Sequence, residues 1–222
     1  MLERHEMSYL PGASLLRYCR ETRPGGSAMM AIGHSGDGRL PHAVSEAQSI
    51  AGIMHGQTYT DEEATLERTH EGLAECRAVH IAAHGEFRSD NPLFSGLALA
   101  NGWLTTLDIF SCRCQASLVT LSSCQTGRNV VGAGDELLGL TRAFLGAGAA
   151  SLVLSLWPVE DRSTARLMEV FYRGMTEGET KAGALRNAQL QALREGFSGN
   201  DAEVTHPYFW APFFLVGDNG DL

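Results

Sequence analysis

Residues 78–85 read AVHIAAHG, an apolar run with one internal histidine that ends on His84 and a glycine. A second run of this kind, residues 117–123 (SLVTLSS), leads directly into Cys124. Continuous apolar runs bounded by turn residues are typical of strands buried on both faces of a parallel sheet. Each of these two predicted strands therefore stops at a residue that is able to take part in chemistry.

The rest of the chain alternates between apolar runs and amphipathic segments. Apolar runs predict further strands at 28–33, 149–156 and 211–217, and an Asn-Gly pair predicts a hairpin within 97–104. Helical periodicity predicts helices at 14–19, 43–54, 61–74, 135–145, 161–175 and 180–195. The alternation indicates an α/β fold, a mostly parallel β-sheet flanked by helices on both faces.

Charge and composition narrow the classes of partner. The 222 residues carry 17 Lys and Arg against 26 Asp and Glu, a formal net charge of -9, so the positive field that holds a phosphate backbone is absent. No apolar run is long enough to span a bilayer, and the charged start lacks the apolar core of a signal peptide. We therefore expect a cytoplasmic protein that binds neither nucleic acid nor membrane.

Cysteine usage and turn residues suggest how the chain is organised. Five cysteines, an odd number at irregular spacing, favour a reducing compartment, and no set has the spacing of zinc ligands, so we expect no metal site. We divide the chain into a short helix and loop at 1–26, a main domain at 27–217 and a polar tail at 218–222.

His84 and Cys124 form a candidate catalytic dyad. The carboxyl ends of adjacent parallel strands meet at one edge of the sheet, which is where open α/β sheets bind ligands. An imidazole at that edge can take the proton of a thiol and later pass it to a leaving amine. Gly85 allows the backbone to approach a substrate carbonyl, so that its amide and that of Cys124 can form an oxyanion hole.

The alternative is that both residues are structural. Free cysteine is among the most buried residue types, and a histidine beside an apolar strand is commonly a hydrogen-bonded structural residue. His80, four residues before His84, faces the same side of the predicted strand but lies within the run. We therefore prefer His84, which stands at the end of the strand, as the base.

Seven blocks of the sequence, in the same order, resemble the CHAT domain, a family of caspase-like cysteine peptidases related to separase. The blocks are residues 79–85 (VHIAAHG), 121–127 (LSSCQTG), 134–137 (GDEL), 146–149 (GAGA), 155–161 (SLWPVED), 171–172 (FY) and 206–213 (HPYFWAPF). The resemblance implies a caspase-like fold in which His84 is the catalytic histidine, Cys124 the nucleophile and Gly85 an oxyanion donor. The caspase signature Gln-Ala-Cys-x-Gly is absent, so caspase specificity for aspartate is not carried over.

Residues 156–161 (LWPVED) resemble the separase segment Leu-Trp-Asp-Val-Thr-Asp, whose last acid lines the pocket for a basic side chain. The resemblance places Asp161 against a Lys or Arg that precedes the scissile bond, and it places Trp157 in the same substrate-binding segment. The alternative for Asp161 is a helix N-cap, because it opens the helix predicted at 161–175.

These features predict a cysteine endopeptidase that cleaves a protein or peptide substrate after attack by a thiol, without metal or organic cofactor. The alternative is a catalytically silent module that uses its caspase-like surface to bind a partner. Members of the family are often attached to tetratricopeptide repeats or sensor domains, so the resemblance also implies a repeat or sensor domain that activates the peptidase. A small-molecule thiol hydrolase lacks the support of the family.

Overall fold

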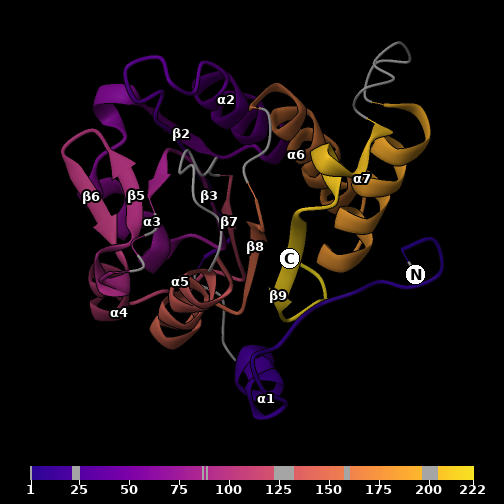
Figure 1. Ribbon diagram of the computed structural model, residues 1–222, viewed down its shortest axis with the longest axis horizontal. Coiled ribbons are helices and arrows are strands. Elements are labelled where there is room, and N and C mark those ends of the chain that lie inside the picture. The colour runs from indigo at the N-terminus through magenta and orange to yellow at the C-terminus, as the bar shows by residue number, and fades with distance from the viewer. Residues whose placement is uncertain are drawn as a thin grey trace.

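A computed structural model describes residues 2–21, 26–86, 88, 90–122, 133–157, 161–196 and 205–222, and for 133–138 and 161 it describes the backbone alone. The centre is a six-stranded sheet in the order β2-β1-β3-β7-β8-β9 (Figure 1). Its strands are β1 (Met29–Gly33), β2 (Gln57–Thr60), β3 (Ala78–Ala82), β7 (Leu118–Leu121), β8 (Ser151–Ser155) and β9 (Phe213–Gly217). Because only β9 runs antiparallel to its neighbour within this sheet, the expected mostly parallel sheet is confirmed.

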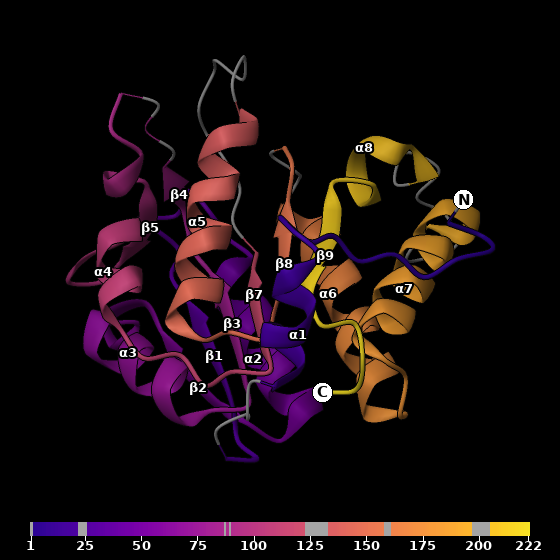
Figure 2. The same cartoon turned by 90° about the horizontal axis from the view of Figure 1, so that it is seen from below.

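Helices cover both faces of the sheet (Figures 1 and 2). One face carries α2 (Ala43–Met54), α6 (Asp161–Thr176) and α7 (Lys181–Glu195). The other carries α3 (Leu66–Glu75), α4 (Thr106–Ser111), α5 (Ala133–Ala147) and, near β9, α1 (Ser14–Glu21). A short helix, α8 (Pro207–Trp210), precedes β9.

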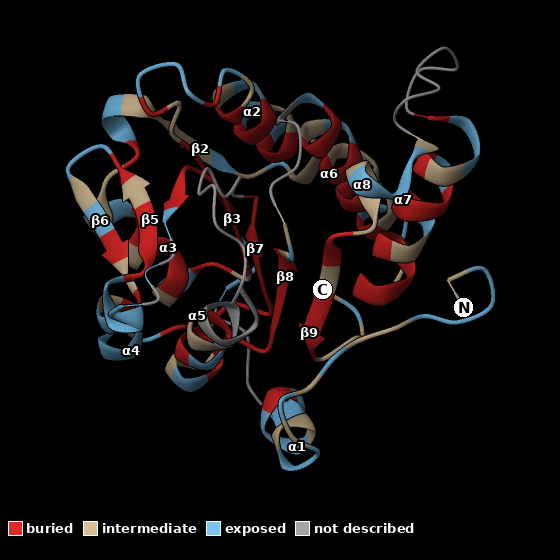
Figure 3. Ribbon diagram, viewed as in Figure 1, coloured by how far each residue is buried: buried red, intermediate tan, exposed pale blue. Residues whose placement is uncertain are grey.

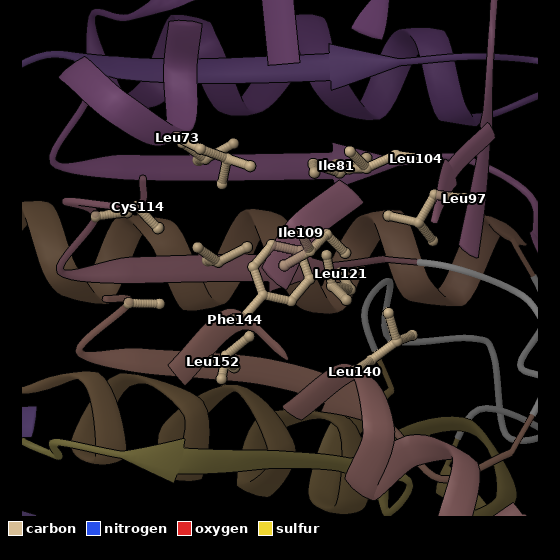
Figure 4. Close-up of a cluster of buried hydrophobic side chains, with 14 of the residues drawn as sticks. Leu73, Ile81, Leu97, Leu104, Ile109, Cys114, Leu121, Leu140, Phe144 and Leu152 are labelled. Atoms are coloured by element: carbon tan, nitrogen blue, oxygen red, sulfur yellow. The ribbon is translucent and has the colours of Figure 1, made fainter. Parts of the chain in front are cut away.

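Alternate residues of each strand divide the hydrophobic core in two. On β1, Met29 and Ala31 pack beneath α2 and α6, whereas Met30 and Ile32 belong to the cluster on the opposite face. Figure 4 shows that second cluster, in which Phe144 of α5 lies over β7 and β8. The inner strands are buried on both faces (Figure 3), which explains why their sequences are continuous apolar runs.

A smaller antiparallel sheet follows directly after β3. It comprises β4 (Gly85–Glu86), β5 (Gly96–Leu99) and β6 (Gly102–Thr105), and a short 3-10 turn, Pro92–Phe94, lies between β4 and β5. The Asn-Gly pair at 101–102 turns between β5 and β6, as the sequence predicted. Thr105 and Asp108 then cap α4 reciprocally, so the hairpin passes directly into a helix.

The predicted helix at 61–74 is wrong at its start. Asp61 begins a single 3-10 turn with a φ of 43°, and its side chain accepts the backbone N–H of Ser35 at 2.9 Å. Helix α3 begins only at Leu66, because Thr65 caps it by accepting the backbone N–H of Arg68. The edge strand β2 was not predicted, since its four residues are partly exposed and form no apolar run.

Residues 218–222 pack against the amino-terminal edge of the sheet. Lys181, the first residue of α7, is fully buried, and its Nζ lies 3.0 Å from Asp218 Oδ2 and 3.3 Å from Ser117 Oγ. Arg77 donates a hydrogen bond to the backbone oxygen of Leu222. The polar tail therefore supplies the carboxylate that neutralises a buried cation.

Candidate active site

The carboxyl ends of β3 and β7 form one edge of the sheet. The two strands are adjacent and parallel, with Ile81 opposite Leu121, and Ser122 donates its backbone N–H to the Ile81 carbonyl at 2.9 Å. His84 lies just past the end of β3. Cys124, the expected nucleophile, lies outside the described residues, which end on this side at Ser122. The structure therefore defines the histidine side of the predicted dyad.

His84 is largely buried, with 7% of its surface exposed. Burial lowers the pKa of its imidazole below the ordinary value, and the nearby Arg39 cation lowers this pKa further, while Glu86 acts in the opposite direction. A lowered pKa keeps the ring neutral at neutral pH, and the neutral ring is the form that accepts a proton. Arg39, in the loop after β1, was not singled out by the sequence.

The small sheet places an aromatic ring against His84. The ring of Trp103, from β6, meets the imidazole edge-on, with 6.2 Å between centroids and an interplanar angle of 70°. Ala98 of β5 donates its backbone N–H to the His84 carbonyl at 2.8 Å. The hairpin was predicted, but nothing in its sequence indicated that it lies beside the histidine, because that contact depends on the pairing of β4 with β5.

Gly85 begins β4 and pairs with Leu97 of β5. It is buried and follows His84 directly, so the position of its backbone is fixed relative to the imidazole by the small sheet. This placement supports the oxyanion interpretation of Gly85, which stays a prediction.

The predicted substrate-binding residues lie after β8. Trp157 is partly buried, and its Nε1 donates to the Tyr208 carbonyl of α8 at 2.9 Å. Helix α8 thus supports this segment. Asp161 is the first residue of α6, and its side chain lies outside the described residues.

His80 occupies the interior of β3, apart from the edge. Its Nε2 lies 2.9 Å from Glu46 Oε1 of α2, and neither side chain is more than 1% exposed. Its ring also meets the ring of Tyr172 edge-on at 5.5 Å. The Tyr172 hydroxyl in turn donates to Thr120 Oγ1 at 2.8 Å. Two buried hydrogen-bonded pairs, in contact through the His80 and Tyr172 rings, thus form an interior network that joins two helices to the sheet.

Four cysteines are described, and all four are free thiols. Burial raises the pKa of Cys19, Cys76 and Cys112, and it raises that of Cys114 to about 12. Thiols with raised pKa values are poor nucleophiles at neutral pH. Within the described ranges, no group of three His, Cys, Asp or Glu side chains is arranged to hold a metal ion.

A cavity of about 510 Å³ lies between β9, α7 and the N-terminal segment. It is lined mainly by apolar side chains, among them Leu185, Trp210 and Phe214. Of the described site residues, His84, Gly85 and Trp157 do not line it. The cavity is therefore distinct from the edge that carries His84.

No helix in the described part of the chain is both long and apolar enough to cross a membrane.

Solved structures with the same arrangement define the class of fold. The Arg-specific cysteine proteinase gingipain R matches 93% of this chain with a TM-score of 0.65 and 11% identity, over 51% of its own chain. Separase, in the Saccharomyces cerevisiae separase–securin complex, matches 96% of this chain with a TM-score of 0.63 and 14% identity, over 14% of its own chain. The fold is that of the caspase-like cysteine proteases.

The sequence assigns the chain to one family with this fold. The CHAT domain model matches residues 1–218, and the chain belongs to the CHAT domain family. Tetratricopeptide repeat protein 28 of Mus musculus and that of Homo sapiens are each 26% identical to it over 83% of this chain. The chain spans only 9% of the length of these relatives.

Proposed function

We propose that the protein is a cysteine endopeptidase that uses a His84–Cys124 dyad. The observation that carries the proposal is a buried histidine at the carboxyl end of β3, with its pKa lowered by burial, beside the strand whose chain continues into Cys124. The caspase-like fold supports it, because this edge of an open α/β sheet is where ligands bind.

The proposed peptide cleavage needs one group that accepts and returns a proton, and it needs no cofactor. His84 takes the proton of the Cys124 thiol, and the sulfur attacks the carbonyl carbon of the scissile peptide bond. The amides of Gly85 and Cys124 hold the negative charge that develops on the carbonyl oxygen. His84 gives its proton to the leaving amine, and water then hydrolyses the acyl-enzyme and frees the thiol.

Selective alkylation tests this function. An acyloxymethyl ketone probe, with the labelled cysteine identified by mass spectrometry, should modify Cys124 well before the other four thiols, since the described ones have raised pKa values. The preference should fall by roughly 10²- to 10⁴-fold in His84→Ala, the usual contribution of a general base. An exposed histidine serves as the matched control, and His5→Ala should keep the preference.

Equal labelling of all five cysteines, in the parent chain and in His84→Ala alike, would contradict a peptidase. It would favour a catalytically silent module that binds a partner through its caspase-like surface.

The two tetratricopeptide repeat relatives support a further proposal, that a repeat or sensor domain activates the site. The free thiols of the described chain suit the reducing cytoplasm, where we place the protein.

Asp161 carries the proposed preference for a basic residue before the scissile bond. Asp161→Ala should lower kcat/KM for peptides with Lys or Arg at that position by about 10²-fold. The reason is that the positive charge of the bound substrate side chain would lose the Asp161 carboxylate as its partner. Peptides with a neutral residue there should be unaffected. If the ratio of kcat/KM for basic peptides to kcat/KM for neutral peptides is the same in the parent chain and in Asp161→Ala, Asp161 does not bind substrate. Its role is then to stabilise the start of α6, where a negative charge is favourable.

A further inference from the structure

Trp103 presents a partly exposed aromatic surface beside the candidate base. It remains 39% exposed although the strand that carries it packs a fully buried residue, Leu104, into the core. Its ring contacts the His84 ring edge-on at 6.2 Å. Trp103 thus forms an apolar wall at the imidazole, and it belongs to none of the hydrophobic core clusters.

This wall is held rigidly relative to His84. Ala98, which pairs with Trp103 across the hairpin, donates its backbone N–H to the His84 carbonyl at 2.8 Å. The tip of the hairpin is tied to α3, because Asn101 accepts the backbone N–H of Leu66 at 2.9 Å and donates to the Glu67 carboxylate at 2.8 Å. A recognition surface supported at both ends loses little entropy when it binds.

The chemistry of the leaving group decides which part of a peptide this wall meets. The imidazole must come within hydrogen-bond reach of the amine that departs, so the residue contributing that amine lies next to His84. A ring packed against the imidazole is consequently near the side chain of the first residue after the scissile bond. An indole offers this side chain a large apolar surface at low entropic cost.

We infer that Trp103 is a specificity-determining residue that binds an apolar or aromatic side chain on the first residue after the scissile bond. This inference rests on the proposed peptidase function. It adds a preference on the leaving-group side to the preference for a basic residue on the acyl side. Its physical basis is the removal of apolar surface from water on both partners.

The test measures cleavage of paired peptides by the full chain. A randomised octapeptide library first locates cleavage positions, and peptides that differ only in the first residue after the cleaved bond are then compared. Phe or Leu at that position should exceed Gly by about tenfold in kcat/KM. Trp103→Ala should reduce this ratio to about one, whereas Trp103→Phe should retain most of it.

Phe110→Ala is the matched control. Phe110 is an exposed aromatic residue on α4, 47% exposed and in the same part of the molecule, and its truncation should leave the ratio unchanged. A ratio that persists in Trp103→Ala, or that Phe110→Ala lowers equally, overturns the inference while the peptidase function stands. Circular dichroism and denaturation midpoints confirm that each variant is folded.

A binding measurement keeps the inference testable without turnover. The Cys124→Ala chain, immobilised with and without Trp103→Ala, captures peptides from the same library, and the captured pool is sequenced. Enrichment of apolar residues that depends on Trp103 supports the inference even where no peptide is cleaved. Absence of such enrichment overturns it, whatever the outcome of labelling at Cys124.

Discussion

Two histidines, one inside strand β3 and one just past its end, occupy opposite environments. His80, in the interior of β3, is hydrogen-bonded to Glu46 and packed on Tyr172, whereas His84, past the end of the strand, has its ring against that of Trp103. Both are largely buried, so burial alone does not distinguish them. The difference is their surroundings: a carboxylate holds one ring in the core, and the other ring lies past the carboxyl end of β3 against the ring of Trp103.

The largest expected effect falls on the interior histidine. Glu46→Leu should lower the free energy of unfolding by about 3 kcal/mol, because His80 would keep its buried ring and lose its partner. Urea denaturation measures this. The double variant Glu46→Leu/His80→Leu should recover part of the loss, since both polar groups are then removed. A double variant as unstable as the sum of the two single ones would show that the pair is not coupled.

A smaller effect should come from the far end of the same network. Tyr172→Phe removes the hydroxyl that donates to Thr120 at 2.8 Å, which should cost about 1 kcal/mol of unfolding free energy. Labelling of Cys124 should be unchanged when it is measured well below the midpoint of denaturation. If Tyr172→Phe stays fully stable but loses labelling of Cys124, the interior network affects the carboxyl edge. The two histidines would then not occupy independent environments.

The last expected effect concerns the dependence of stability on pH. The pKa of His84 is lower in the folded chain than its ordinary value. At a pH between these two pKa values, the unfolded chain therefore binds more protons than the folded chain does. Stability should therefore fall with decreasing pH, by at most about 1.4 kcal/mol per pH unit for one group. His84→Gln should reduce this slope, which denaturation at pH 5 to 7 would detect. An equal slope in both proteins would mean that the imidazole titrates normally.

The sequence predicted the layout of the sheet better than the surroundings of the site. Continuous apolar runs identified β1, β3, β7, β8 and β9, since strands buried on both faces leave that pattern. The same criterion missed β2, an edge strand with residues that are partly exposed. It also misplaced the start of α3, because the acids at 61–63 resemble a first helical turn while Thr65 is the residue that caps.

Contacts between distant segments account for most of what the sequence did not indicate. The pairing of Glu46 with His80 joins a helix to a strand, and that of Trp103 with His84 joins a hairpin to a loop. Neither pair has a regular spacing along the chain that a pattern could reveal. The role of Cys124 was predicted from its place at the end of an apolar run and from the family resemblance, and that of Asp161 from the resemblance alone. The side chains of both residues lie outside the described residues.

The ion pair between Lys181 and Asp218 bears on where the chain can be cut. Trimming after Gly217, where β9 ends, would leave a fully buried ammonium without its carboxylate. Burial already lowers the pKa of Lys181, and Asp218 is the main group that opposes this shift, so a shortened chain would discard a charge or admit water at the start of α7. Tags and fused partners should accordingly be joined beyond the last residue of the tail.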